Sequence, residues 1–242
     1  RYYTFIYTML YAMEDCAKYG KEFIVLDRLN PLGGKIVEGN VLQDTYRSFV
    51  GGYSLCMRYG LTAGEFATMA NLEASNKYNL KVVLCEGWKR DMLFEDTENI
   101  WVMPTINICS PHTALLYSGM CLFEGTNISE GRGTTRPFEI IGAPFIDAQL
   151  LADNMNSKKI PGVIFRPVHF KPYSSKFKGE LCHGLQIHVI NAHKMRAVEV
   201  GIKLIYEIHN AYPDKFMFLP PYKEGARPFI DLLAGNDKLR GF

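Results

Sequence analysis

The chain opens with a helical pattern that leads directly into a short apolar run, and this pair limits the fold more than any other feature. Within residues 2–19 apolar side chains recur at helical spacing, and Gly20 is a typical helix stop. The run FIVLD at residues 23–27 follows at once, and apolar runs of this length are typical of buried parallel strands. Because a helix followed by a buried strand is half of a βαβ unit, we predict an α/β fold.

The elements that follow predict two domains. Thr62 and Glu65 have the spacing of a capping box that begins a helix, and a second strand is predicted at residues 80–85. Beyond residue 147, helices at 148–156, 196–212 and 229–235 accompany strands at 162–167 and 182–189, the latter alternating apolar with polar residues. We expect residues 1–147 to form an α/β domain and residues 148–242 a smaller α+β domain.

Composition and charge exclude several classes of protein. Hydrophobic residues make up 48% of the 242 residues and charged residues 21%, which is typical of a globular protein with a real core. The 27 basic and 25 acidic residues form no run of like charge, whereas nucleic-acid binding usually needs a basic stripe. No apolar run reaches the ~18–20 residues of a membrane span. The six cysteines form no CxxC pair or zinc-site pattern, so we predict structural thiols.

The stretch at residues 122–144, LFEGTNISEGRGTTRPFEIIGAP, is the main candidate for a functional loop. It looks too rich in glycine for a regular helix or strand, and Gly125, Gly131 and Gly133 would let the main chain approach a ligand closely. Its carboxylates and guanidinium groups offer the acceptors and forked donors that a polar ligand needs. The alternative is an ordinary surface loop with solvated charges. The density of charges between apolar flanks favours the functional loop.

Further polar candidates lie outside that stretch. Asp27, Arg28 and Asn30 follow the first strand, at the end where open α/β sheets bind ligands, although a charged structural turn would look the same. His112 stands just before an apolar helical turn. Gln186 and His188 would project from the polar side of their strand, and they would either line a cleft or meet solvent.

Several phrases together resemble one family: LDRLNPLGG at 26–34, YRSFVGGY at 46–53, FEGTNISEGRGTTRPFE at 123–139, GAPFID at 142–147 and GLQIHV at 184–189. The chain is similar, over essentially its whole length, to the exo-β-N-acetylmuramidases of bacterial cell-wall turnover (NamZ type), formerly described as a domain of unknown function. The resemblance implies that residues 1–147 are the C-terminal portion of a Rossmann-like catalytic domain and residues 148–242 a smaller α+β domain, with the active cleft between the two. It implies release of terminal N-acetylmuramic acid from the non-reducing end of peptidoglycan fragments.

The resemblance carries four further expectations. It implies no metal or nucleotide cofactor, and a periplasmic or exported location. The expected partners are muramic acid saccharides derived from peptidoglycan, without nucleic acid. Family members carry a further segment ahead of the point where this chain begins, with a Gly-Pro-Glu-His-Gly motif whose glutamate is a candidate catalytic acid. Any catalytic residue named in this chain is therefore expected to be part of a larger site.

Glycoside hydrolysis typically uses one carboxyl group to protonate the leaving oxygen and a second to attack or to activate water. Glu124 and Glu130 are the catalytic candidates in this chain. A planar guanidinium is the natural partner of the lactyl carboxylate of muramic acid, so Arg132 and Arg136 are predicted to bind it. The alternative is that these arginines pair with Glu130 and Glu139. The full predicted substrate-binding set is Asp27, Arg28, Asn30, His112, Asn127, Arg132, Arg136, Glu139, Gln186 and His188.

Two other functions remain open from the sequence. One is a non-catalytic protein that binds muropeptides or glycans. The other is a sugar transferase on a Rossmann-like fold, which is disfavoured because no GxGxxG motif follows a predicted strand.

Overall fold

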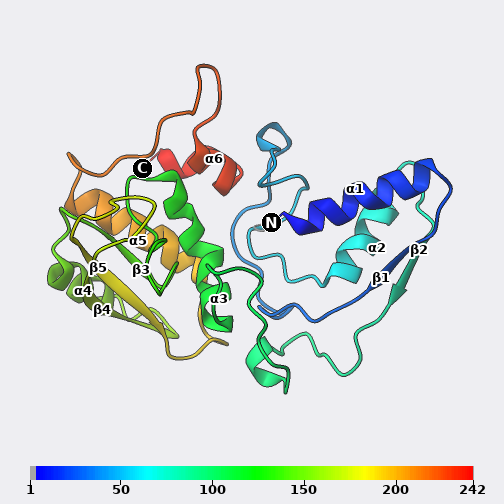
Figure 1. Ribbon diagram of the computed structural model, residues 1–242, viewed down its shortest axis with the longest axis horizontal. Helices are drawn as coiled ribbons and strands as arrows, with labels where there is room; N and C mark the ends of the chain where they lie inside the picture. The colour runs from blue at the N-terminus through cyan, green and yellow to red at the C-terminus, as the bar shows by residue number, and fades with distance from the viewer. Residues whose placement is uncertain (1–3, 242) are drawn as a thin grey trace.

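The computed structural model describes residues 4–241 and shows two α/β bodies side by side (Figure 1). The first body holds α1 (Phe5–Lys18), β1 (Phe23–Leu26), α2 (Ala63–Glu73) and β2 (Leu80–Val83). The second body holds α3 (Pro111–Met120), β3 (Ile140–Ala143), α4 (Ala148–Ser157), β4 (Val163–Phe170), β5 (Cys182–Val189), α5 (Ala197–Ala211) and α6 (Phe229–Ala234). The predicted α/β fold with two domains is confirmed.

The first body is a β1–α2–β2 unit with α1 packed against it. β1 and β2 pair in parallel, and α2 begins at the predicted capping box, in which the Glu65 amide donates to Thr62 Oγ1 at 3.1 Å. Only Val25 of β1 is buried, whereas Ile24 and Leu26 are 49% and 71% exposed. The expectation of a strand buried on both faces is therefore wrong, because α1 and α2 cover one face only. Residues 2 and 3 of the predicted first helix lie outside the described residues.

The second body is built on an antiparallel sheet with the strand order β3-β5-β4. Leu185 and Ile187 of β5 are buried beneath α4 and α5, as the alternating pattern predicts. β3 was not predicted, because it lies at the end of the glycine-rich stretch that looked irregular. All four of its residues are buried, and it pairs with β5 from Ile140 opposite Gln186 to Ala143 opposite His183.

Helices α3 and α5 cross with their main chains in contact. A Cβ atom built on Gly119 would lie 1.8 Å from the carbonyl oxygen of Ala197, and one on Gly201 would lie 2.5 Å from that of Gly119. Glycine at both positions therefore permits the crossing. As a result α3 lies on the side of the second body that faces the first (Figure 1).

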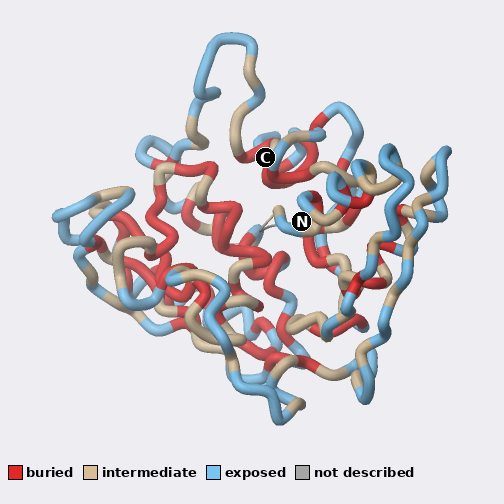
Figure 2. The backbone as a smooth tube through the Cα atoms, turned by 45° about the vertical axis from the view of Figure 1, so that its right-hand side comes forward, coloured by how far each residue is buried: buried red, intermediate tan, exposed pale blue. Residues whose placement is uncertain are grey.

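The larger hydrophobic core belongs to the second body, where most of the buried chain is found (Figure 2). Met57 and Leu93, from outside the second body, also join this core, so the two bodies pack directly on each other. The domain boundary at residue 147 stays a prediction, although β3, which precedes it, pairs with a strand that follows it. Among residues 4–241, each helix is too short or too polar to span a bilayer.

Candidate functional site

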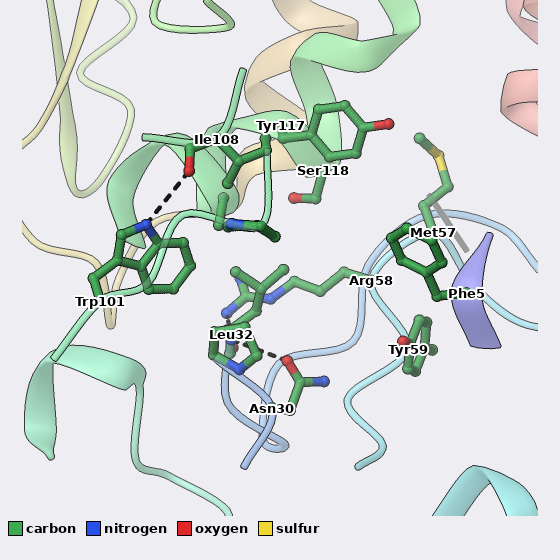
Figure 3. A pocket seen from close by; sticks show the side chains of 13 residues that line it. Phe5, Asn30, Leu32, Met57, Arg58, Tyr59, Trp101, Ile108, Tyr117 and Ser118 are labelled. Carbon is green, nitrogen blue, oxygen red and sulfur yellow. Dashed lines mark hydrogen bonds between the residues drawn. The ribbon is translucent and has the colours of Figure 1, made fainter. Parts of the chain in front are cut away.

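A cavity of about 220 Å³ lies where the two bodies meet (Figure 3). We call it the cleft. Its walls come from the loop after β1 (residues 30–32), residues 57–59, the segment 101–108 and the inner side of α3. Most of these side chains are apolar, and a few polar groups project among them, which is the usual make-up of a small-molecule site.

The loop after β1 is held in shape by its own side chains. Asn30, which lines the cleft, donates from Nδ2 to the carbonyl of Leu61 at 2.9 Å and accepts from the Leu32 amide at 2.9 Å. Asp27 accepts from the Gly64 amide and from Thr62 Oγ1, both at 2.7 Å, so its carboxylate tethers the start of α2. Both Asp27 and the exposed Arg28 line a neighbouring cavity that also contacts Trp101.

Arg58 is the charged residue at the centre of the cleft, and the sequence analysis missed it. It is only 2% exposed, and its guanidinium donates to Glu38 at 3.0 Å and to the carbonyl of Leu32 at 2.5 Å. Figure 3 shows the side chain extending toward Leu32. Its Nε is buried without a hydrogen-bond partner among the described residues. Burial lowers the pKa of Arg58, and Glu38 opposes that shift. The one sequence signal is a lone arginine among the apolar residues 55–61.

Trp101 and Tyr117 are two aromatic side chains that line the cleft together with Arg58. Trp101 donates from its indole nitrogen to the carbonyl of Ile108 at 3.4 Å and packs edge to face on Phe94 at 4.8 Å. Tyr117 of α3 packs edge to face on Phe138 at 4.7 Å. Both rings are therefore fixed by their neighbours. Amphipathic aromatic side chains of this kind suit a ligand with one apolar face and several hydroxyls.

The loop at residues 122–144 forms a network of buried charges. Glu130 accepts from Lys176 Nζ at 2.9 Å and lies 3.4 Å from Arg132 Nε. Arg132 also donates to Glu124 at 2.5 Å. Lys176 makes two further hydrogen bonds, to the carbonyls of Phe123 at 2.7 Å and residue 128 at 3.0 Å. Burial raises the pKa of Glu124, and the neighbouring Arg132 guanidinium opposes the rise.

The ring of Phe138 lies between Arg132 of this network and Tyr117 in the wall of the cleft. The Arg132 guanidinium lies over the ring of Phe138 at 5.0 Å, and Phe138 contacts Tyr117, which lines the cleft. Residues 122–143 line none of the five cavities described for residues 4–241. Phe138 has a φ of 62°, a conformation that costs energy for a bulky side chain. The structure thus brings Glu124, Glu130 and Arg132 together, but not into the cleft.

The remaining residues of that loop contact other parts of the second body. Glu139 is buried, accepting from Thr113 Oγ1 at 2.5 Å and from Arg136 Nη1 at 3.1 Å. The alternative in which Arg136 pairs with Glu139 is therefore the one that the structure shows. Asn127 exchanges side-chain hydrogen bonds with the main chain at residues 215 and 217, at 2.7 and 2.9 Å. These contacts give Arg136, Glu139 and Asn127 a structural role.

The other predicted residues lie apart from the cleft. His112 Nε2 lies 2.8 Å from Glu95 Oε1 on the surface. Gln186 accepts from Arg166 on the neighbouring strand at 3.0 Å. His188, two residues further along β5, has a buried Nε2 with no hydrogen-bond partner among the described residues. A substrate-binding role for these three residues stays a prediction.

The described residues contain no group of three or more His, Cys, Asp or Glu side chains that could hold a metal ion. All six cysteines are free thiols.

Fold and cleft together define a two-domain α/β protein with a cavity of about 220 Å³ where its two bodies meet. Two family models account for nearly the whole chain: the N-terminal model of the exo-beta-N-acetylmuramidase NamZ matches residues 1–112, and its C-terminal model matches residues 115–241. The chain belongs to the exo-β-N-acetylmuramidase NamZ family, which confirms the sequence resemblance.

Relatives of known name or structure agree with this assignment. The chain is 46% identical over 240 residues to the peptidoglycan beta-N-acetylmuramidase NamZ of Bacillus subtilis (strain 168), covering 99% of this chain and 56% of that protein. It therefore spans little more than half the length of that relative. Two crystal structures of DUF1343 family proteins from Bacteroides fragilis NCTC 9343 cover all of this chain, which spans 63% of each. Their TM-scores are 0.91 and 0.67, at 38% and 29% identity.

Proposed function

We propose that the protein carrying this chain is an exo-acting glycoside hydrolase that releases terminal N-acetylmuramic acid from the non-reducing end of peptidoglycan fragments. One observation carries the proposal, namely the 46% identity, over 99% of the chain, to a peptidoglycan β-N-acetylmuramidase. The cleft supports it independently, because it is a small, mostly apolar cavity between two domains.

In this proposal the cleft receives the muramic acid ring. Trp101 and Tyr117 offer aromatic surface to the apolar face of the sugar, and Ser118 and Asn30 offer polar atoms to its hydroxyl and acetamido groups. The apolar walls exclude water, which strengthens each polar contact that the sugar makes.

Glu124 and Glu130 remain the proposed carboxyl groups of the chemistry, and the structure supports them unequally. Burial favours the protonated form of Glu124, as a general acid requires, because the pKa of that carboxyl is raised. Glu130 is ion-paired with Lys176 and Arg132, an arrangement that also serves purely to hold the loop together. Because neither glutamate lines the cleft, participation of either one requires the loop at residues 122–144 to move.

A chromogenic N-acetylmuramide tests the proposal in the protein that carries this chain. The wild type should release the chromophore, and Glu124→Gln should lower kcat at least about 100-fold, since a general acid contributes roughly that much. Glu130→Gln is measured alongside, with thermal unfolding to detect a loss of fold. Glu199→Gln, in an exposed ion pair on α5, is the control and should keep full activity. Full turnover by the Glu124 and Glu130 variants would remove both carboxyl groups from the chemistry.

A second candidate function is binding of muropeptides without hydrolysis. It is favoured by one observation: among the 13 described residues that line the cleft, none is an acid. In that case N-acetylmuramic acid would bind in a calorimetric titration while the chromogenic muramide stayed intact with the wild-type protein. Release of the chromophore by the wild type would exclude this function.

We also propose a periplasmic or exported location, because the proposed substrate lies outside the cytoplasmic membrane. Fractionation of cells that produce the protein tests this, and recovery with the cytosolic fraction would contradict it.

A further inference from the structure

A second cavity, of about 410 Å³, adjoins the cleft and carries a different chemistry. We call it the basic cavity. Four of its lining side chains are permanent cations, Lys35, Arg58, Arg90 and Arg196, and His193 is a fifth basic group. Asp91 is the only acid among its lining residues. Arg58 and Leu32 line both cavities, so they form the partition between the basic cavity and the cleft.

Three of the basic groups already have acidic partners. Arg58 pairs with Glu38 at 3.0 Å, Arg90 pairs with Glu65, and His193 lies 3.1 Å from Asp96. Lys35 and Arg196 have no ion pair with any residue in the described part of the chain, and both are exposed to solvent. These two cations are therefore available to a ligand.

The two available cations come from different bodies. Lys35 follows the loop after β1, whereas Arg196 immediately precedes α5, whose first turn adds the positive end of a helix dipole. Both guanidinium groups line this cavity, and the positive charge of Arg196 adds a smaller contribution to the lowering of the Arg58 pKa that burial causes. An anion placed among these cations would relieve the repulsion between like charges.

Arg58, which lies between the two cavities, has one hydrogen-bond donor without a partner in the part of the chain that the structure describes. Arg58 is 2% exposed, and its Nε is buried with no hydrogen-bond partner among the described residues. A buried donor without an acceptor costs free energy, and native proteins retain few of them. The Arg58 side chain lines both cavities, so its positive charge is shared between them.

We propose that the basic cavity binds a carboxylate group of the substrate while the sugar ring occupies the cleft on the other side of Arg58. This inference rests on the proposed function, and it assigns Lys35 and Arg196 as residues that determine specificity for acid-bearing sugars. Muramic acid carries such a group in two forms. The lactyl carboxylate is free in an unsubstituted residue, and in a peptide-bearing residue it becomes an amide while the peptide supplies other carboxylates.

The double variant Lys35→Met/Arg196→Met tests the proposal in the protein that carries this chain. Three chromogenic substrates are compared: N-acetylmuramide, its neutral lactyl amide, and the muramoyl dipeptide. We expect KM for the acid-bearing substrates to rise about tenfold, which corresponds to ~1.4 kcal/mol, with kcat unchanged. KM for the neutral amide should stay the same. The wild-type preference for acids over the amide should shrink as salt is added.

The three substrates distinguish the two sources of the carboxylate. A rise in KM confined to N-acetylmuramide identifies the lactyl group, and a rise confined to the muramoyl dipeptide identifies the peptide. The control, Lys21→Met/Lys171→Met, removes two exposed lysines outside the basic cavity and should leave every KM unchanged. Equal KM values for wild type and the Lys35/Arg196 variant on both acids, or an equal rise for the neutral amide, overturn the proposal.

A binding measurement separates failure of this inference from failure of the proposed hydrolysis. Calorimetric titration compares N-acetylmuramic acid with N-acetylglucosamine, which lacks the lactyl group, and adds muramoyl dipeptide as a third ligand. If the wild type hydrolyses nothing but binds an acid more tightly than N-acetylglucosamine, and the double variant loses that difference, the carboxylate site stands without the hydrolase. No preference for either acid in the wild type overturns the carboxylate site.

Discussion

At the scale of single residues, Glu38 joins the two bodies. Its Oε2 accepts from Arg58 Nη1 at 3.0 Å, and its Oε1 accepts from the amide of Val198 at 3.1 Å. Val198 lies in the first turn of α5, where a carboxylate interacts favourably with unpaired amides and with the helix dipole. One buried carboxylate therefore neutralises the arginine of the cleft and caps a helix of the other body.

Replacing Glu38 with Gln should be strongly destabilising. Removing one partner of a buried ion pair leaves an uncompensated charge and typically costs about 3–5 kcal/mol. Urea unfolding measures the change. The control is Lys203→Met, which breaks the exposed pair between Lys203 and Glu199 and should cost less than about 1 kcal/mol. Equal effects of the two substitutions would show that the pair with Arg58 contributes little.

Glu124 should respond to the loss of Arg132. Burial raises the pKa of Glu124 above 4.5, and the hydrogen bond and charge of Arg132 oppose the rise. Arg132→Ala removes that opposition, so the pKa should rise further. Carbon-13 NMR titration of the Glu124 carboxyl group measures the shift, and an unchanged or lower pKa would contradict the network.

The same shift sets a dependence of stability on pH. Because folding raises the pKa of Glu124, its protonation stabilises the folded state. That contribution is complete below the unfolded pKa and is lost as the pH rises through the folded pKa. As the pH rises from about 4 to about 7, the free energy of unfolding measured with denaturant should therefore fall in the wild type. The fall should be smaller in Glu124→Gln, because glutamine does not titrate.

At the scale of elements, the crossing of α3 and α5 depends on two glycines. Gly119→Ala places a methyl group 1.8 Å from the carbonyl oxygen of Ala197. Both groups are attached to helix backbone, so the helices must separate. We expect the free energy of unfolding to fall, because overpacking of about 1–3 kcal/mol or more outweighs the ~1 kcal/mol that alanine adds over glycine in helix propensity. Thermal unfolding measures the change. Gly241→Ala, whose nearest neighbouring atom would lie 3.5 Å away, is the control. Similar melting temperatures for both variants would contradict the close crossing.

The strands of the second body show why some element boundaries escaped prediction. The strand expected at residues 162–167 is β4, which runs past Pro167 to Phe170. It lies at the edge of the sheet, where a missing amide is tolerated. β3 was hidden by the glycines around it. Its Gly142 is required, because a Cβ there would lie 2.5 Å from the carbonyl oxygen of His183 on β5.

At the scale of the whole molecule, the cleft exists only because two bodies meet. Trp101 lines both the cleft and the neighbouring cavity at Arg28, so a sugar in either should cover its indole. We expect N-acetylmuramic acid to shift the tryptophan emission to shorter wavelength as water leaves the ring. Fluorescence titration should show the shift in wild type and in Trp88→Phe, and not in Trp101→Phe. A shift that survives Trp101→Phe would place the ligand elsewhere.

The sequence by itself determined the order and type of nearly every helix and strand, since these follow from local periods and from caps such as Thr62 with Glu65. It also placed the chain in its family. Only the tertiary structure decided which charges meet. Arg58 lies 20 residues from Glu38, and Glu38 lies 160 residues from Val198. Glu130 meets Lys176 across 46 residues and does not line the cleft. The burial and pairing of a charge depend on groups that folding brings from distant positions, and local spacing carries no record of them.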